Sequence, residues 1–96
     1  MIRQIAGVLR STEAAGLIRV EGHTDDDPIS TPQFPSNWEL STARGTAVVA
    51  ALLESEKLSA ERISAAGYAE YHPIAPNDTT EGRAQNRRVD LVVTAR

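Results

Sequence analysis

The chain has 96 residues, of which 41% are hydrophobic and 24% charged; this is the composition of one small globular domain and argues against disorder. The net charge of −3 argues against a general nucleic-acid binder, because binding to a phosphate backbone relies on basic residues. The absence of cysteine excludes disulfides and thiolate metal sites, and no apolar run approaches the ~20 residues of a membrane helix.

The first part of the chain predicts a helix, a strand and a long loop. Residues 2–14 have the apolar spacing of an amphipathic helix, and Gly16 is a typical helix stop. Residues 17–22 alternate between apolar and polar side chains, which predicts a strand. The Pro-containing segment 23–36 has no periodicity. We expect a loop here, and long loops between regular elements often carry function.

The longest predicted helix follows this loop. Ser36 and Glu39 have the spacing of a capping box, which predicts a helix start near Asn37 and a helix that runs to about Glu56. At about 100° per residue, Arg44 lies in the apolar arc of this helix. A buried guanidinium requires a carboxylate or several acceptors, whereas a snorkelling side chain would carry its head to water. The residue pattern leaves both alternatives open.

The second part of the chain predicts shorter elements. In chain order these are a turn over 58–62, a strand over 63–69, a loop over 70–80, a helical turn over 81–86 and a strand over 87–95. Thr79 or Thr80 is expected to cap the helical turn. The strand, long helix and strand form a crossover unit, so the first two strands should be parallel. Since the chain begins on a helix, we expect that an N-terminal strand is missing.

Polar side chains converge on one end of the predicted sheet. Asp25 follows the first strand and Asn37 lies in the first turn of the long helix, on the side where ligands bind to open α/β sheets. With the helix arginine, they offer an acceptor and a guanidinium fork for the ammonium and carboxylate of an amino acid. The segment 82–90 adds three arginines, which suit carboxylate recognition or form a solvated basic edge. Alternation places Arg87 and Arg88 on opposite faces.

A metal-dependent hydrolase is a weaker interpretation. Its candidate ligands are nearly contiguous: His23, Asp25, Asp26 and Asp27. No second group of ligands follows at a spacing typical of metal sites, and His72 is isolated in a loop. No nucleophile–base pair is recognisable either. We therefore expect no enzyme activity, no metal and no cofactor, with His23 a hydrogen-bonded structural residue.

Five sequence blocks resemble the OmpA-like peptidoglycan-binding domain, and the similarity runs from about residue 2 to residue 94. The blocks are GHTD (22–25), N-x-x-LS-x-x-R (37–44), GY (67–68), P-I-A-x-N-x-T-x-EGR (73–83) and NRRV (86–89). Within the family the chain is most similar to the MotB type, the stator subunit of the flagellar motor, because of the acidic loop 26–29 and the segment FPSNWELS.

The resemblance implies an α/β (α+β) sandwich, with helices packed on one face of a small mixed sheet. It further implies that residues 1–96 form a single domain of a longer, membrane-anchored protein. The usual N-terminal strand of the family is absent, and we expect it to be trimmed or supplied by another chain. The implied function is noncovalent binding of peptidoglycan through its diaminopimelate-containing stem peptide.

The resemblance also implies roles for particular residues. Asp25 would bind the ammonium of the diaminopimelate head and Arg44 its carboxylate, with Asp25 nearby as counter-charge. Asn37 would hydrogen-bond the same region of the ligand, and Arg87 would make a further contact with a ligand carboxylate. Leu40 would line the pocket. The complete set of implied binding residues also includes two members of the same motifs, Thr24 and Asn86.

The implied setting is the periplasm, with the parent protein tethered to the inner membrane. The expected partners are peptidoglycan, a second copy of the chain and a stator membrane subunit, and no nucleic acid. An alternative stays open. The chain could be a dimerising interaction module of an envelope protein or lipoprotein, with weak or no cell-wall binding, since an open sheet edge invites pairing.

Overall fold

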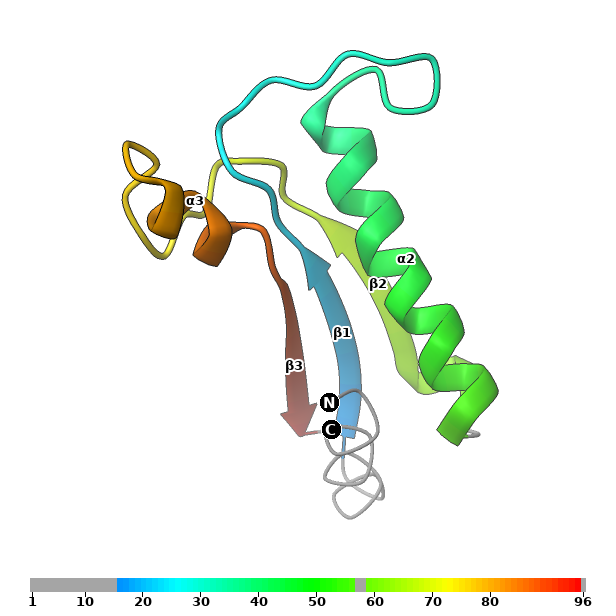
Figure 1. Cartoon of the computed structure of the whole chain (residues 1–96). Helices are drawn as coiled ribbons and strands as arrows, with labels where there is room; N and C mark the ends of the chain where they lie inside the picture. The colour runs from blue at the N-terminus through cyan, green and yellow to red at the C-terminus, as the bar shows by residue number, and fades with distance from the viewer. Residues whose placement is uncertain (1–15, 57–58, 96) are drawn as a thin grey trace.

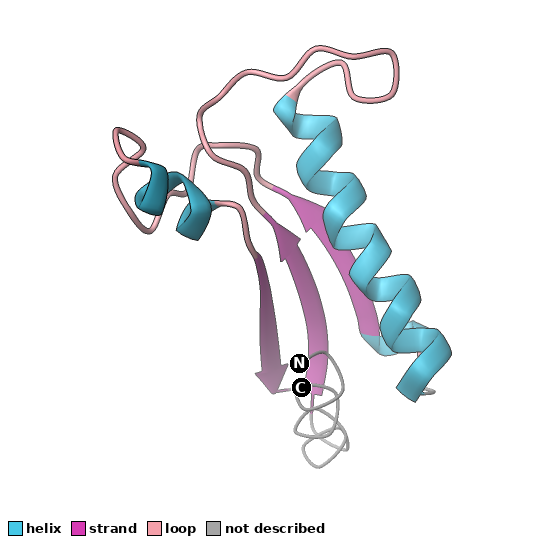
Figure 2. Cartoon of the chain, viewed as in Figure 1, coloured by secondary structure: helices cyan, strands magenta, loops and turns pink. Residues whose placement is uncertain are grey.

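The computed structural model of the chain describes residues 16–56 and 59–95, so the helix predicted over 2–14 lies outside the described residues. Figures 1 and 2 show one long helix against a small sheet, with a second helix at one end. The elements in chain order are β1 (Gly16–Gly22), α2 (Asn37–Glu56), the 3-10 turn η2 (Ala60–Arg62), β2 (Ile63–Gly67), α3 (Thr80–Asn86) and β3 (Val89–Ala95).

The three described strands form a mixed sheet with the order β2-β1-β3. β1 is parallel to β2, with Val20 opposite Ala65, and antiparallel to β3, with Val20 opposite Leu91. The parallel pairing confirms the prediction from the strand–helix–strand unit. β1 is therefore the central strand, and its carboxyl end lies between the end of β2 and the beginning of β3.

The core lies between the sheet and α2. Ile18 and Val20 are 2% and 0% exposed, whereas their neighbours Leu17 and Arg19 are exposed, as the alternation predicts. Leu52 of α2 packs against both buried strand residues. Burying one such aliphatic side chain stabilises the fold by about 1.5–3 kcal/mol. The partly buried residues around this core are Val48, Val49, Leu53, Ile63, Val89 and Leu91.

The helix and the sheet come closest at the end of β1. A Cβ atom built on Gly22 would overlap the backbone carbonyl of Ser41, so only glycine fits between the strand and α2. The Ser41 hydroxyl also accepts a hydrogen bond from the backbone N–H of Ala69, at 3.0 Å. This close approach brings the first half of α2 against the segments that follow β1 and β2.

The start of α2 agrees with the capping prediction. The Ser36 hydroxyl is hydrogen-bonded to the Glu39 carboxylate, and the Trp38 N–H donates to Ser36 Oγ at 3.2 Å. The bond from Ser36 lowers the pKa of the Glu39 carboxyl. The side chain of Glu39 thus contacts the Ser36 hydroxyl, and the helix runs over Asn37–Glu56 as expected.

β1 begins at Gly16, which was predicted to end the first helix, rather than at residue 17. Two further strand boundaries were predicted wrongly. β2 ends at Gly67 rather than at residue 69, because Ala69 has a φ of 54° and turns the chain away from the sheet. β3 begins at Val89 rather than at residue 87, because the Arg87 N–H still bonds the Arg83 carbonyl, at 3.1 Å, at the end of α3. Both segments lie next to the polar residues that the sequence singles out.

Thr79 is the residue that caps α3, since its hydroxyl accepts a hydrogen bond from the Gly82 N–H at 2.9 Å. Replacing Thr79 with alanine should lower the free energy of unfolding by about 1 kcal/mol, because that N–H loses its acceptor. Urea unfolding measures this change. Replacing Thr80, which lies inside the helix, should lower the free energy of unfolding by less. If both variants lost the same stability, Thr79 would not be the cap.

Candidate functional site

The two long connections of the chain meet at one end of the sheet. The loop 23–36 leaves the end of β1, residues 68–79 leave the end of β2, and α3 leads into the beginning of β3 (Figure 1). The backbone N–H of Thr24 donates to the carbonyl of Ala69 at 3.0 Å, which joins the two connections. Residues far apart in sequence are thereby placed around the short segment 23–27.

Asp25 is the buried acid of this segment, with 6% of its surface exposed. Its Oδ2 lies 2.6 Å from Arg87 Nη1, and its Oδ1 accepts the backbone N–H of Asp27 at 3.1 Å. Charge-assisted bonds of this kind are about twice as strong as neutral ones. The Arg87 side chain is 42% exposed. The ion pair therefore joins the loop after β1 to the segment before β3, and its arginine reaches solvent.

Thr24 and Asn37 fix the backbone around Asp25, and both are buried. The Thr24 hydroxyl donates to the Asp25 carbonyl at 2.7 Å. Asn37 Nδ2 donates to the Asp27 carbonyl at 3.1 Å and to the Asp25 carbonyl at 3.5 Å. Asn37 thus ties the start of α2 to the acidic loop.

Arg44 lies half-buried on α2, as does Leu40 one turn earlier. Its Nη1 donates to the His23 carbonyl at 3.4 Å, a long bond that leaves most of its five N–H donors without a described acceptor. The ion pair of Asp25 is with Arg87, so Asp25 does not pair directly with Arg44 among the described contacts. The guanidinium of Arg44 is available to a further acceptor.

Asn86 is fully buried, and its amide is used internally. Its Oδ1 accepts the N–H groups of Ile74 and Ala75 at 2.8 Å and 3.0 Å. Its Nδ2 donates to the Ala75 carbonyl at 2.9 Å and to Asn77 Oδ1 at 2.8 Å. Asn86 therefore holds the loop 74–77 in place, and its amide has no free donor for a ligand.

Arg83 is a third arginine of this region that was not among the predicted binding residues. Its Nη1 donates to the Asn77 carbonyl at 3.0 Å, and its Nε lies 4.0 Å from Asp27 Oδ2. The sequence signal for it is the EGR block of the resemblance. The region thus combines the acidic segment 25–27 with three guanidinium groups, those of Arg44, Arg83 and Arg87.

On the other face of the sheet, Arg88 occupies a separate position. Its Nε lies 3.1 Å from Asp90 Oδ2, and its Nη2 donates to the His72 carbonyl at 2.9 Å. Arg87 reaches Asp25 instead. The two adjacent arginines therefore contact different partners, although both precede β3 and strand alternation does not apply to them.

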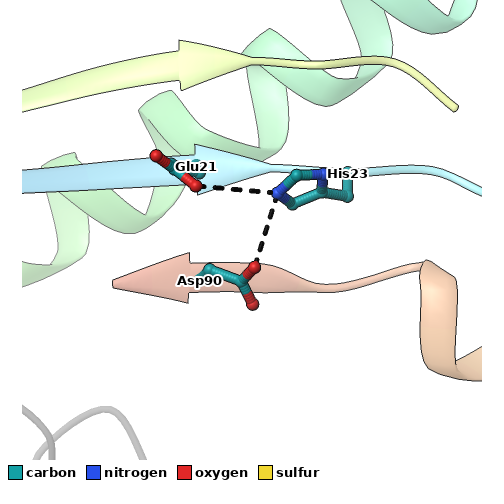
Figure 3. A group of neighbouring side chains, drawn as sticks. All are labelled: Glu21, His23 and Asp90. Atoms are coloured by element: carbon teal, nitrogen blue, oxygen red, sulfur yellow. Dashed lines mark ion pairs between the residues drawn. The ribbon is translucent and has the colours of Figure 1, made fainter. Parts of the chain in front are cut away.

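His23 is buried at the strand end, but the expectation that it is hydrogen-bonded was wrong. It is 3% exposed, and neither ring nitrogen has a hydrogen-bond partner among the described residues. Figure 3 shows its Nε2 directed towards two carboxylates, Asp90 Oδ2 at 3.5 Å and Glu21 Oε1 at 3.9 Å. Burial lowers the pKa of His23 and the charge of Arg88 lowers it further, against the opposing effect of the two carboxylates. The ring is therefore held towards its neutral form.

A cavity of about 330 Å³ lies at the opposite end of the strands, lined by residues that include Leu17, Arg62 and Thr94. None of the predicted binding residues lines it. Charge and hydrogen bonding mark the candidate site.

Comparison with known families places the site in context. The profile of the OmpA family matches residues 1–87, which include the acidic loop, the start of α2 and α3. The chain belongs to the OmpA family. The first four blocks of the resemblance lie within the matched range, and the last block, NRRV (86–89), extends two residues beyond it.

Named relatives of this OmpA-family chain include a motility protein and an outer membrane protein. Motility protein B of Bacillus subtilis is 41% identical over 96 residues, which is 100% of this chain and 36% of the relative. Outer membrane protein Omp38 of Acinetobacter baumannii is 45% identical over 76 residues, which is 79% of this chain and 20% of the relative. The OmpA-family chain thus spans about a third or less of these relatives.

Solved structures share the fold. The C-terminal domain of Helicobacter pylori MotB superimposes with a TM-score of 0.91 at 32% identity, over 99% of this chain and 71% of the other. The cell wall anchor of the type VI secretion system (T6SS) of Pseudomonas aeruginosa gives a TM-score of 0.85 at 41% identity, over 99% of this chain and 64% of the other. These neighbours confirm the predicted α/β architecture. Within the described part of the chain, no helix has the length and apolar character to span a membrane.

Proposed function

We propose that this chain binds peptidoglycan noncovalently, through the diaminopimelate-containing stem peptide, and anchors a longer membrane protein to the cell wall. The observation that carries the proposal is the arrangement at the strand ends. Asp25 is buried with Arg87 on its Oδ2, and Arg44, half-buried on α2, donates to the carbonyl of His23, two residues before Asp25. A buried acid in the loop after β1 and a guanidinium from α2 that meets the same loop suit a ligand that carries both charges.

The proposed contacts follow from the donors and acceptors that remain. Two carboxylate oxygens offer about four lone-pair sites, and Asp25 uses one on Arg87 and one on the Asp27 N–H. The remaining lone pairs can accept the ammonium of diaminopimelate. Its carboxylate would pair with the fork of Arg44 and with the donors of Arg87 that Asp25 does not use. Leu40 would contact the aliphatic part of the ligand. Thr24, Asn37 and Asn86 would hold the backbone around it.

The parent protein and its partners are part of the same proposal. The likeness to Motility protein B and to the MotB domain supports a flagellar stator subunit, with this region in the periplasm, tethered to the inner membrane. A second copy of the chain and a stator membrane subunit are the proposed partners. The role is one of binding rather than of catalysis. The T6SS cell wall anchor among the structural neighbours supports the anchoring function itself.

Replacing Arg44 with alanine should abolish co-sedimentation of the chain with purified diaminopimelate-type peptidoglycan while leaving the circular-dichroism spectrum unchanged. The reason is that the ligand carboxylate loses its fork, and a charge-assisted pair contributes enough to weaken binding by at least about tenfold. Replacing Arg19, which is exposed on β1 away from the site, removes the same charge and should leave binding unchanged. Equal binding of the two variants would overturn the proposal.

A second arm tests the ligand itself. Soluble stem peptides that differ only in diaminopimelate or lysine should be titrated and followed by NMR. Lysine retains the ammonium but lacks the carboxylate, so the unmodified chain should prefer the diaminopimelate peptide by about tenfold. The Arg44 variant should lose this preference. If both peptides bind equally to the unmodified chain, the cell wall is recognised through another group.

A further inference from the structure

We propose that Glu21, His23 and Asp90 form a binding site for a divalent transition-metal ion, with Zn²⁺ as the favoured ion. The site joins the end of β1 to the beginning of β3, on the face of the sheet opposite to α2. It is separate from the residues proposed to bind peptidoglycan.

The three residues share one face because of the sheet register. Glu21 lies opposite Asp90 in the antiparallel pair β1–β3, and His23 follows Glu21 by two positions, so all three side chains leave the same face. One ligand atom from each residue lies within 4.8 Å of the others. Figure 3 shows the imidazole directed at both carboxylates from the end of the strand.

The distances suit a metal ion better than direct hydrogen bonds. His23 Nε2 lies 3.5 Å from Asp90 Oδ2 and 3.9 Å from Glu21 Oε1, and the ring has no hydrogen-bond partner among the described residues. A tetrahedral Zn²⁺ with ligand bonds of 2.0–2.2 Å holds its ligand atoms about 3.3–3.6 Å apart. A small closure of the three side chains would therefore form three bonds and leave a fourth position for water.

The burial of His23 supplies an independent reason. Its side chain is 4% exposed, and a buried polar atom without a partner is rare in native proteins, so the ring nitrogens are suited to a ligand of their own. Histidine binds metals as the neutral imidazole. Imidazole with carboxylates suits zinc and its neighbours in the periodic table, whereas Mg²⁺ prefers oxygen ligands alone.

The surroundings orient the two carboxylates without using all of their oxygen lone pairs. Arg19 Nε contacts Glu21 Oε2 at 2.6 Å and leaves Oε1 towards His23. Arg88 Nε contacts both Asp90 oxygens, at 3.1 Å and 3.2 Å, and each oxygen keeps a further lone pair. Outer contacts of this kind hold metal ligands in place. Asp90 is 42% exposed, so an ion can enter from solvent.

The test is a calorimetric titration of the chain with ZnCl₂ and, separately, MgCl₂, combined with NMR of the two histidine rings. We expect one saturable Zn²⁺ site, a change in the His23 ring signals with Zn²⁺ and not with Mg²⁺, and a raised Tm. Asp90→Asn should weaken Zn²⁺ binding by at least about tenfold, because it removes a ligand from the exposed side of the site. Asp90 is a partly exposed residue, so this variant remains informative even if changes at His23 prevent folding.

Two controls make the test specific. Glu54→Gln removes an exposed carboxylate on α2, and His72→Gln removes the other histidine of the chain. Neither change should alter Zn²⁺ affinity. The proposal is overturned if no saturable binding occurs, if Asp90→Asn binds Zn²⁺ as tightly as Glu54→Gln does, or if binding is lost in His72→Gln instead.

Discussion

Replacing Gly22 with alanine should lower the free energy of unfolding by about 3 kcal/mol, at the upper end of the range for an overpacked site. The added methyl group would overlap the backbone carbonyl of Ser41, which is fixed within α2 and cannot move aside as a side chain would. Relief therefore requires the helix to move away from the end of β1. Urea unfolding with a check of the m-value measures the loss.

The matched control is Gly45→Ala, inside α2. A Cβ atom there would lie 3.2 Å from the Ala66 carbonyl oxygen and 3.3 Å from that of Val20, which is tight but without overlap. Alanine also favours a helix by about 1 kcal/mol over glycine, which offsets the tight contacts. We expect its stability to remain within about 1 kcal/mol of the original chain. If both variants lost the same stability, the close approach at Gly22 would not be the cause.

Replacing Asn86 with alanine is the second change expected to have a large effect, about 3 kcal/mol or more on unfolding. It leaves the N–H groups of Ile74 and Ala75 and the Ala75 carbonyl, all in part-buried hydrogen bonds, without their side-chain partner. Each buried polar group without a partner costs about 1–3 kcal/mol. Thermal and urea unfolding measure the change.

Gln85→Ala is the control, because Gln85 is the exposed neighbour of Asn86 on the same short helix. It should change the stability by no more than about 0.5 kcal/mol, as surface substitutions usually do. A stability loss for Asn86→Ala as small as that of Gln85→Ala would mean that the loop 74–77 does not depend on this amide.

Much of the fold follows from local patterns in the sequence. The alternation around Ile18 and Val20 predicts β1 and its buried face, and the spacing of Ser36 and Glu39 predicts the start of α2. These signals are local, so they can be read without tertiary contacts. The ends of β2 and β3 depend on the left-handed conformation of Ala69 and on the hydrogen bond of the Arg87 N–H, which side-chain patterns do not record.

The sequence predicted which residues lie at the candidate site better than it predicted which of them form ion pairs with each other. The sequence brings Asp25 and Arg44 to one end of the sheet, but the ion pair of Asp25 is with Arg87, 62 residues away. That partner depends on the path of the chain between α3 and β3. Glu21 and Asp90 were missed because they meet only through the β1–β3 register, which sequence alone does not set.

The central position of β1 has a mechanical consequence for the proposed anchoring function. Asp25 follows β1 by only a few residues, so a pull on a ligand bound there is transmitted along this strand. β1 is hydrogen-bonded to β2 on one side and to β3 on the other. Force between the bound end and Gly16, at the opposite end of the strand, loads these bonds in shear and all together. A strand at the edge would peel away one bond at a time under a sideways pull, whereas this arrangement shares the tension across the whole sheet.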